Sequence, residues 1–150
     1  MSSADLHCLP LLEVAERIRR RELSPVTVLE AILDRITRLD GASHSYTTLL
    51  PDRARAAAAR AEAEVAAGFW RGPLHGIPLA VKDLCATSFA PTTGGMPIRR
   101  NSTPDHDATV VRRLEDAGAV IVGKLKMTEG AYTSHHPDDP TPLNPWSAAH

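Results

Sequence analysis

The sequence predicts an α/β protein in which a layer of helices precedes a mixed β-sheet core covered by helices. In the first 68 residues, apolar side chains recur at spacings of three and four, the period of an amphipathic helix. Residues 77 to 122 read instead as strand, loop, helix and strand, the order that gives at least partly parallel sheets. We therefore expect a helical layer over residues 1–69 and the start of an α/β core over residues 70–150.

Three helices are expected in the first layer. The first covers Pro10 to Arg21. Ser24-Pro25 predicts the start of the second, because serine supplies an N-cap oxygen and proline fits the first helical turn. Its apolar pattern continues to about Asp40-Gly41. The third runs from Arg53 to Ala67, where a bias towards alanine favours helix, and Gly68 is its expected stop.

The second part of the chain alternates strands and loops. Ile77 to Val81 is a short apolar run suited to a buried strand. A loop from about Thr87 to Asp107 leads to a helix from Ala108 to Ala117, and Val120 to Val122 forms the next strand. On this helix Val110 and Val111 are expected to face inward, and Asp107 is expected to cap its start. The stretch from His135 to His150 has four prolines and no periodicity, so we expect a loop there.

Composition excludes several classes of protein. A chain of 150 residues with 43% hydrophobic and 23% charged residues is suited to one globular domain. The formal charge of −1 offers no basic field for nucleic acid or an anionic membrane. Cys8 and Cys85 lie far apart without metal or disulfide spacing, which favours a reducing compartment. With no signal peptide and no long apolar run, we expect a cytoplasmic protein.

Lys82 is the first candidate for chemistry, because it directly follows the apolar run that ends at Val81. Either its side chain reaches out to water or pairs with Asp83, or it lies in a site with reduced solvation. Desolvation disfavours the ammonium and lowers a lysine pKa by up to ~3–5 units. A lysine shifted in this way serves as a general base near neutral pH. Position alone leaves both interpretations open.

The stretch from Gly72 to Asp83 resembles the segment of amidase signature enzymes that carries their catalytic lysine. Further segments resemble the family's following loop, helix start, next strand and turn, and the tripeptide before its glycine- and serine-rich signature. In the family's order they are Pro91-Thr92-Thr93-Gly94, Asp107 to Val111, Gly118 to Lys124 with Met127-Thr128-Glu129, and Asn144-Pro145-Trp146. Together they cover nearly the whole chain, which is therefore identified as the N-terminal part of a member of this family.

The resemblance implies a mechanism that uses a nucleophilic serine, a bridging serine with a cis peptide bond, and a lysine. It assigns the lysine role to Lys82, which accepts a proton through the bridging serine and later returns one to the leaving amine. Both serines are expected in the stretch after Trp146, of which the sequence holds only Ser147-Ala148-Ala149-His150. The expected parent activity is hydrolysis of carboxylic amides to acid and ammonia or amine, and the isolated 150 residues are expected to be inactive.

The resemblance also implies a substrate pocket and no cofactor. Thr128, Ala131 and Tyr132 follow the site-lining strand and are expected to contribute to the acyl pocket. Neither a metal nor an organic cofactor is expected, and the expected partner is a small-molecule amide, with a possible homo-oligomer for the full-length form. Three alternatives stay open: a non-catalytic remnant, a ligand-binding α/β module, and an amidase-like subunit of a glutamine amidotransferase.

Other reactive side chains have plainer interpretations. Cys85 lies close to Lys82 in sequence, but a buried inert thiol is the more common role. His135-His136 with Asp138-Asp139 suggests metal ligands, yet adjacent histidines rarely face one site, so a loop facing solvent or substrate is favoured. His75 is expected to have a structural role.

Overall fold

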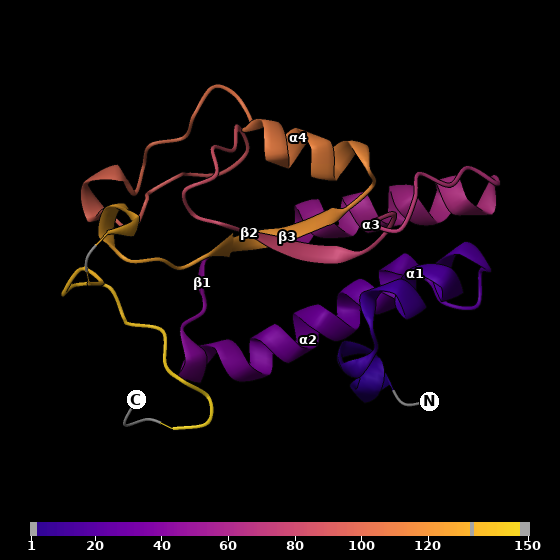
Figure 1. Ribbon diagram of the computed structural model, residues 1–150, viewed down its shortest axis with the longest axis horizontal. Helices are drawn as coiled ribbons and strands as arrows, with labels where there is room; N and C mark the ends of the chain where they lie inside the picture. Colours follow the sequence, from indigo (N-terminus) through magenta and orange to yellow (C-terminus); the bar gives the residue numbers. More distant parts are fainter. Residues whose placement is uncertain (1–2, 133, 148–150) are drawn as a thin grey trace. The chain divides into compact units, whose positions relative to one another are not determined.

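The computed structural model describes residues 3–132 and 134–147, and it is an α/β protein, as predicted (Figure 1). In chain order the main elements are α1 (Leu11–Arg19), α2 (Pro25–Ser43), β1 (Tyr46–Leu49), α3 (Pro51–Ala66), β2 (Pro78–Lys82), α4 (Thr109–Asp116) and β3 (Val120–Leu125). Short 3₁₀ helices cover Ser3–Cys8, Pro97–Arg99 and Glu129–Ala131. No helix of the described residues is long and apolar enough to cross a membrane.

The three strands form one mixed sheet in the order β1-β3-β2. β1 pairs with β3 in the antiparallel sense. Two backbone hydrogen bonds show that β2 and β3 run in parallel: Val120 donates to Ile77 over 2.9 Å, and Asp83 donates to Leu125 over 3.0 Å. Parallel strands end at the same edge of a sheet, so the residues that close β2 and β3 meet there.

Strand β1 was not predicted from the sequence, and it interrupts the expected helical layer. It has only four residues, too few for periodicity to reveal a strand. Its pairing depends on Gly123 in β3, because a Cβ atom there would lie 2.4 Å from the carbonyl oxygen of Thr48. The pairing is therefore set by a contact between segments that are distant in the sequence.

The sequence signals for helices mostly located these helices correctly. The Ser24 hydroxyl accepts hydrogen bonds from the backbone N–H groups of Val26 (3.1 Å) and Thr27 (3.2 Å), as expected of an N-cap. The prediction for α4 was wrong in one respect: Val110 is half exposed, whereas its neighbour Val111 is fully buried. Asp107, expected to cap this helix, accepts a hydrogen bond from the backbone of Ser88 over 2.6 Å.

The chain divides into two compact units. Unit 1 consists of Met1–Thr37, Leu50–Leu79 and Arg113–Val122, and unit 2 of Arg38–Leu49, Ala80–Arg112 and Gly123–His150.

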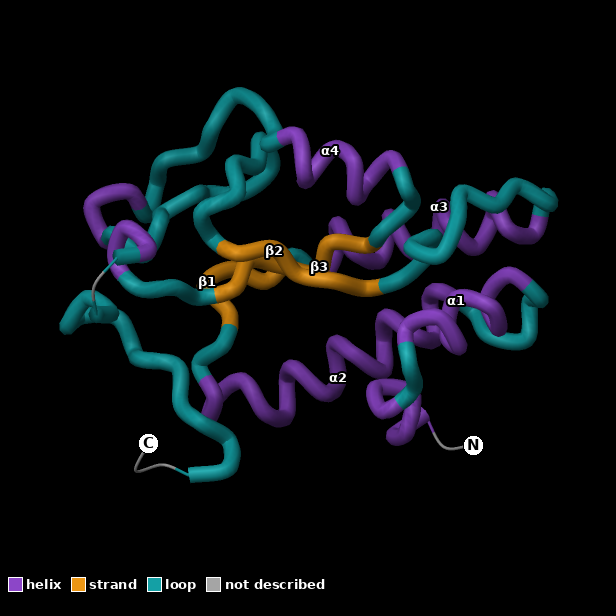
Figure 2. Tube along the Cα trace, in the orientation of Figure 1, coloured by secondary structure: helices purple, strands orange, loops and turns teal. Residues whose placement is uncertain are grey.

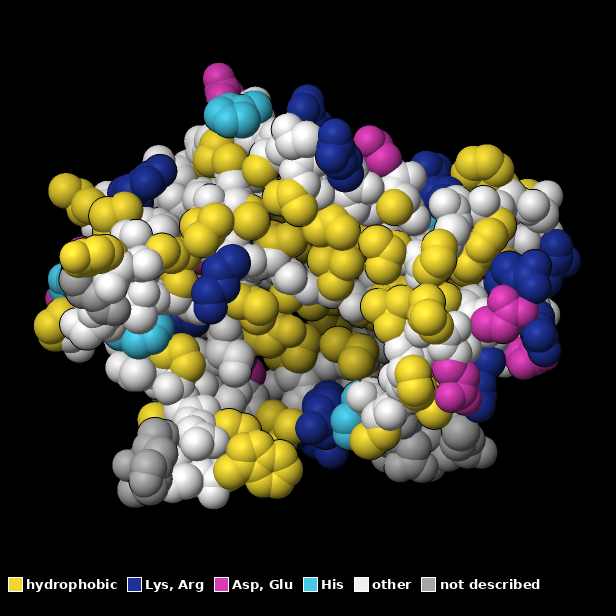
Figure 3. Space-filling view, in the orientation of Figure 1, with side chains coloured by type: hydrophobic (Ala, Val, Ile, Leu, Met, Phe, Trp, Pro, Cys, Tyr) yellow, Lys and Arg dark blue, Asp and Glu magenta, His cyan; other side chains and the backbone are white. Residues whose placement is uncertain are grey.

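Unit 1 has an apolar core between helices and a charged outer face. The core joins Val14, Ala15, Ile18, Val28, Val65 and Ile77. On the outer face of α1, Arg19 and Arg20 pair with Glu16 at 2.8 and 2.7 Å. Charged side chains of both signs gather at the right of Figure 3, around the end of α1. Arg19 and Arg20 therefore lie on a solvated face of paired charges.

Unit 2 is built largely of loops, and its interior is polar. Figure 2 shows that most of the chain between β2 and α4 is loop, as the sequence predicted. Loops leave backbone groups that need partners when they are buried. The buried polar side chains of this unit supply several of these partners: Asp83, Thr87, Thr92, Thr93, Lys124 and Lys126.

Candidate active site

Lys82 closes strand β2, and its side chain is exposed. Together with Thr128 and Ala131 it lines an open pocket of about 550 Å³ in unit 2. Tyr132, the fourth residue expected at the site, is 91% exposed and is not among the lining residues. The structure thus brings together three of the four residues, which come from the end of β2 and from the turn after β3.

Much of the pocket wall is apolar. Besides Ala131, the apolar lining residues are Leu84, Leu125, Met127 and Pro142. Polar groups are contributed by Ser45, Lys126 and His135. A pocket of this kind suits a small molecule that has an apolar portion and a few polar atoms.

Close backbone contacts hold the turn beside Thr128 in place. A Cβ atom at Gly95 would lie 2.7 Å from the carbonyl oxygen of Thr128 and 2.8 Å from that of Met127. The next contact is a hydrogen bond of 2.8 Å from the backbone N–H of Gly130 to the carbonyl of Gly94. The loop after β2 therefore approaches the turn after β3 backbone to backbone, which only glycine at position 95 permits.

An ion pair holds the loop that contains His135, His136, Asp138 and Asp139. Lys126, which is 8% exposed, donates to Asp139 over 2.7 Å and to the carbonyl of Pro140 over 3.0 Å. His136 lies 3.8 Å from Asp138. No group of three metal-ligating side chains occurs in the described part of the chain. Asp139 therefore anchors the loop, and His135 reaches the pocket that Lys82 lines.

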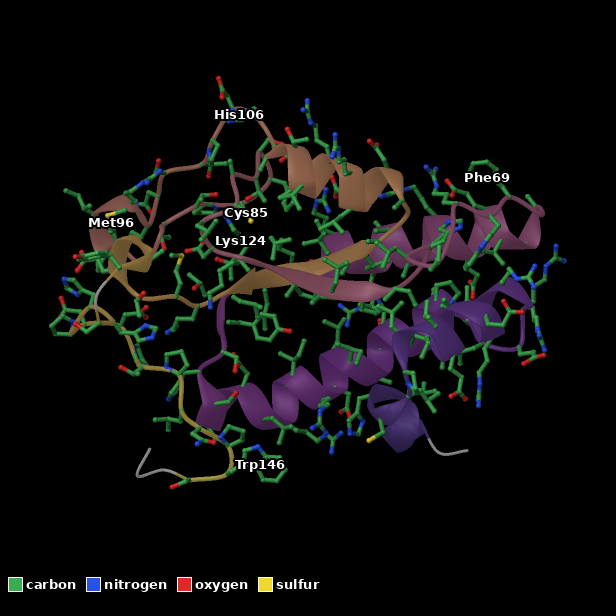
Figure 4. All side chains as sticks on the ribbon, in the orientation of Figure 1. Phe69, Cys85, Met96, His106, Lys124 and Trp146 are labelled. Carbon is green, nitrogen blue, oxygen red and sulfur yellow. The ribbon has the colours of Figure 1, made fainter. Side chains whose placement is uncertain are left out.

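Lys124 lies at the end of β3 and is fully buried. Its ammonium donates to the carbonyls of Cys85 and Pro91, each over 3.0 Å. The hydroxyls of Thr87 and Thr92 lie 3.2 and 2.5 Å from the same nitrogen, whose three N–H groups are shared among these oxygens. Figure 4 shows Lys124 beside Cys85. One side chain thus organises the whole loop that follows β2.

Asp83 is the anionic partner of Lys124 and is also fully buried. The Lys124 nitrogen lies 3.1 Å from an oxygen of Asp83. The second carboxylate oxygen accepts hydrogen bonds from the hydroxyl of Thr93 and, over 3.3 Å, from its backbone N–H. Burial lowers the pKa of Lys124 from its usual value, and the hydrogen bond and charge of Asp83 oppose that shift.

Sequence reasoning singled out Lys82 and missed Lys124. A detectable signal was present, because Lys124 also follows an apolar run, Val120 to Val122, and the argument applied to Lys82 applies to it equally. The structure buries the second lysine and leaves the first exposed. Asp83, which the sequence could have paired with Lys82, pairs with Lys124.

His75 belongs to unit 1 and has the environment of a structural residue. Its side chain is buried, and its Nδ1 accepts a hydrogen bond of 3.2 Å from the backbone of Arg71. Its Nε2 lies 3.0 Å from a carboxylate oxygen of Glu64. Burial lowers the pKa of His75, while the Glu64 charge opposes the shift. This agrees with the structural role expected from the sequence.

Comparison with known proteins decides the family. The family model described as Amidase matches residues 27–150. The chain belongs to the amidase signature family.

Individual amidase-family relatives agree with this membership. The chain is 54% identical over 138 residues to a Mycobacterium tuberculosis protein named "Putative amidase AmiD", covering 92% of this chain and 29% of the relative. It is 45% identical over 140 residues to a glutamyl-tRNA(Gln) amidotransferase subunit from Anaeromyxobacter dehalogenans, covering 92% and 28%. Native peptide amidase from Stenotrophomonas maltophilia is a structural neighbour with a TM-score of 0.75 and 38% identity, over 79% of this chain and 25% of that one. The chain thus spans under a third of the length of these proteins.

Proposed function

We propose that this chain supplies Lys82 as the proton carrier of an amidase that hydrolyses carboxylic amides to an acid and ammonia or an amine. The proposal rests on one juxtaposition: Lys82 opens onto the same pocket as Thr128 and Ala131. Membership of the amidase signature family supports the type of reaction. The apolar lining by Leu84 and Met127 favours a substrate whose acyl group has an apolar portion.

In the proposed reaction, a serine hydroxyl attacks the amide carbon, and its proton passes through the bridging serine to the uncharged amine of Lys82. The lysine then returns a proton to the leaving nitrogen as the carbon–nitrogen bond breaks. Water hydrolyses the acyl-enzyme by the same relay and regenerates the serine. Backbone N–H groups beside the nucleophile stabilise the developing oxyanion. From the family resemblance, both serines are expected in the stretch that follows Asn144-Pro145-Trp146.

A chimera tests whether Lys82 has this role. The 138 residues of this chain that match AmiD of Mycobacterium tuberculosis replace their counterparts in that protein. Ammonia release is measured over a panel of aliphatic and aromatic primary amides, first for AmiD itself and then for the chimera. We expect Lys82→Ala to reduce kcat of the chimera by about 10²–10⁴-fold, the usual contribution of a positioned acid–base group.

Two further variants sharpen the test. Lys82→Arg keeps the positive charge but cannot lose it, so it is expected to be as inactive as Lys82→Ala. Arg60→Ala removes another exposed cation and is expected to keep full activity. A chimera that stays active with Lys82→Ala would contradict the proposal.

A second candidate function is that of an amidotransferase subunit. The observation in its favour is the 45% identity to a glutamyl-tRNA(Gln) amidotransferase subunit. Glutamine distinguishes the two functions: an amidotransferase subunit is expected to release ammonia from glutamine and to require partner subunits. An independent amidase is expected to hydrolyse other amides without them.

A further inference from the structure

Lys82 and Asp83 are adjacent in the sequence but lie in opposite environments. The Lys82 side chain is exposed, whereas Asp83 is fully buried. An opposite charge within about 4–6 Å of an amine favours its charged form. A lysine that must accept a proton is therefore hindered by a carboxylate at its side. The sequence places such a carboxylate directly after Lys82.

The structure directs that carboxylate to another cation. Lys124 reaches Asp83 from the neighbouring strand, and their charged atoms lie 3.1 Å apart. The backbone of Asp83 is fixed as well, since its N–H donates to Leu125 over 3.0 Å and its carbonyl accepts from Gly94 over 3.1 Å. Asp83 is thus held in the interior by both its side chain and its backbone.

We propose that Lys124 is a positioning residue, which holds the Asp83 carboxylate inside unit 2 and so leaves Lys82 without that counter-ion. The inference rests on the proposed function, because only a lysine that acts uncharged benefits from this arrangement. The other titratable groups lining the Lys82 pocket are Lys126 and His135. Lys126 is occupied by Asp139 at 2.7 Å. Both groups are bases, so neither can replace Asp83 as a counter-ion.

The rate at which Lys82 is acylated tests the proposal, because only a neutral amine reacts with an activated ester. The sequence contains three lysines, Lys82, Lys124 and Lys126, so peptide mass spectrometry can follow each one separately. The folded 150-residue chain is treated with an acetylating ester at pH 8, and rates are normalised to an added lysine peptide. In the unaltered chain, Lys82 is expected to react readily and the buried Lys124 slowly.

In Lys124→Met the buried carboxylate of Asp83 loses the cation that compensates it, so an uncompensated negative charge lies one residue away from Lys82. We expect acylation of Lys82 to slow by about three- to tenfold. In the double variant Lys124→Met with Asp83→Asn, the charge on residue 83 is gone, so the rate is expected to return to that of the unaltered chain. Arg71→Met is the matched control: it removes an ion pair at 2.7 Å from unit 1 and is expected to leave Lys82 unchanged.

A purely structural role for Lys124 gives a different pattern. If the Lys82 rate is unchanged in a Lys124→Met chain that keeps its dispersed amide NMR spectrum, the proposal is overturned. It is equally overturned if the double variant reacts as slowly as Lys124→Met. Should Lys124→Met not fold, Lys124→Gln keeps a hydrogen-bond donor beside Asp83 but removes the charge, and it is expected to slow Lys82 to a similar degree. Acylation requires no amide hydrolysis, so a negative result here is separable from an inactive chimera.

Discussion

The ammonium nitrogen of Lys124 lies 3.1 Å from a carboxylate oxygen of Asp83, and both side chains are fully buried. This pair joins the ends of two parallel strands, β3 and β2. Removing one partner of a buried pair leaves an uncompensated charge, which is far more destabilising than losing a surface ion pair. Removing either partner alone is therefore expected to destabilise unit 2 strongly.

Lys124→Met is expected to lower the free energy of unfolding by about 3–5 kcal/mol. Asp83→Asn is expected to lower it as well, and the double variant to lose at least about 1 kcal/mol less than the sum of the two, because neither isolated charge remains. Urea unfolding of the unaltered chain, the two single variants and the double variant measures this double-mutant cycle. Strict additivity would show that the two side chains do not interact in solution.

Two glycines of unit 2 are expected to respond to alanine in opposite ways. Gly95 has φ of +72° and would place a Cβ atom 2.7 Å from the carbonyl oxygen of Thr128. Gly95→Ala is therefore expected to destabilise the chain by at least about 2 kcal/mol. Gly41 lies in helix α2 with no atom within 4 Å of an added Cβ, so Gly41→Ala is expected to stabilise it by about 0.5–1 kcal/mol.

Thermal unfolding of the two glycine variants provides the comparison. Equal losses of stability in both would mean that the close approach of the loop at Gly95 to the turn at Thr128 is absent in solution. A second measurement adds small amides to each variant and follows the NMR signals of residues that line the Lys82 pocket. Only Gly95→Ala is expected to change this response, because only that substitution disturbs the pocket wall.

His75 is expected to make unit 1 sensitive to mild acid. Burial lowers its pKa below the usual 6.5, so the unfolded chain takes up a proton at a higher pH than the folded chain does. The stability that the neutral ring contributes is fully present above pH 6.5 and is lost as the pH falls towards the lowered pKa. Glu64, whose pKa is lowered chiefly by its hydrogen bond to Arg71, contributes a separate loss below its usual 4.5.

Urea unfolding between pH 8 and pH 5 measures the effect of His75. The loss of stability between pH 6.5 and pH 5 is expected to disappear in His75→Gln and to persist in His7→Gln, which replaces an exposed histidine. An identical pH profile in all three chains would contradict the assignment of this loss to His75.

The fold class could be predicted because it depends on local patterns. The Ser24 cap, the apolar stripe of α2 and the alternation of strand and helix after Gly76 all act over a few residues. Strand β1 could not be predicted, since its four residues become a strand only by pairing with β3. Val110 was misplaced for a related reason: a helix pattern defines an apolar face, but the neighbouring elements decide how much of that face is covered.

The candidate site could be predicted in part. The family resemblance located Lys82, Thr128 and Ala131, which the structure places on one pocket. The resemblance did not indicate which of Lys82 and Lys124 is buried, because each lysine lies at the end of an apolar strand. Burial depends on the loop from Cys85 to Thr92, whose oxygens surround the ammonium of Lys124. That loop has no periodicity, so its course was outside the reach of sequence patterns.

The exposure of Lys82 leads to a last prediction, which separates catalysis from folding. An exposed side chain contributes little to stability, so Lys82→Ala is expected to change the free energy of unfolding by no more than about 0.5 kcal/mol. The same substitution in the chimera is expected to abolish most of the amide hydrolysis. Urea unfolding and ammonia release on the same preparation test both halves. If Lys82→Ala lost much stability, its inactivity could not be attributed to the missing proton carrier.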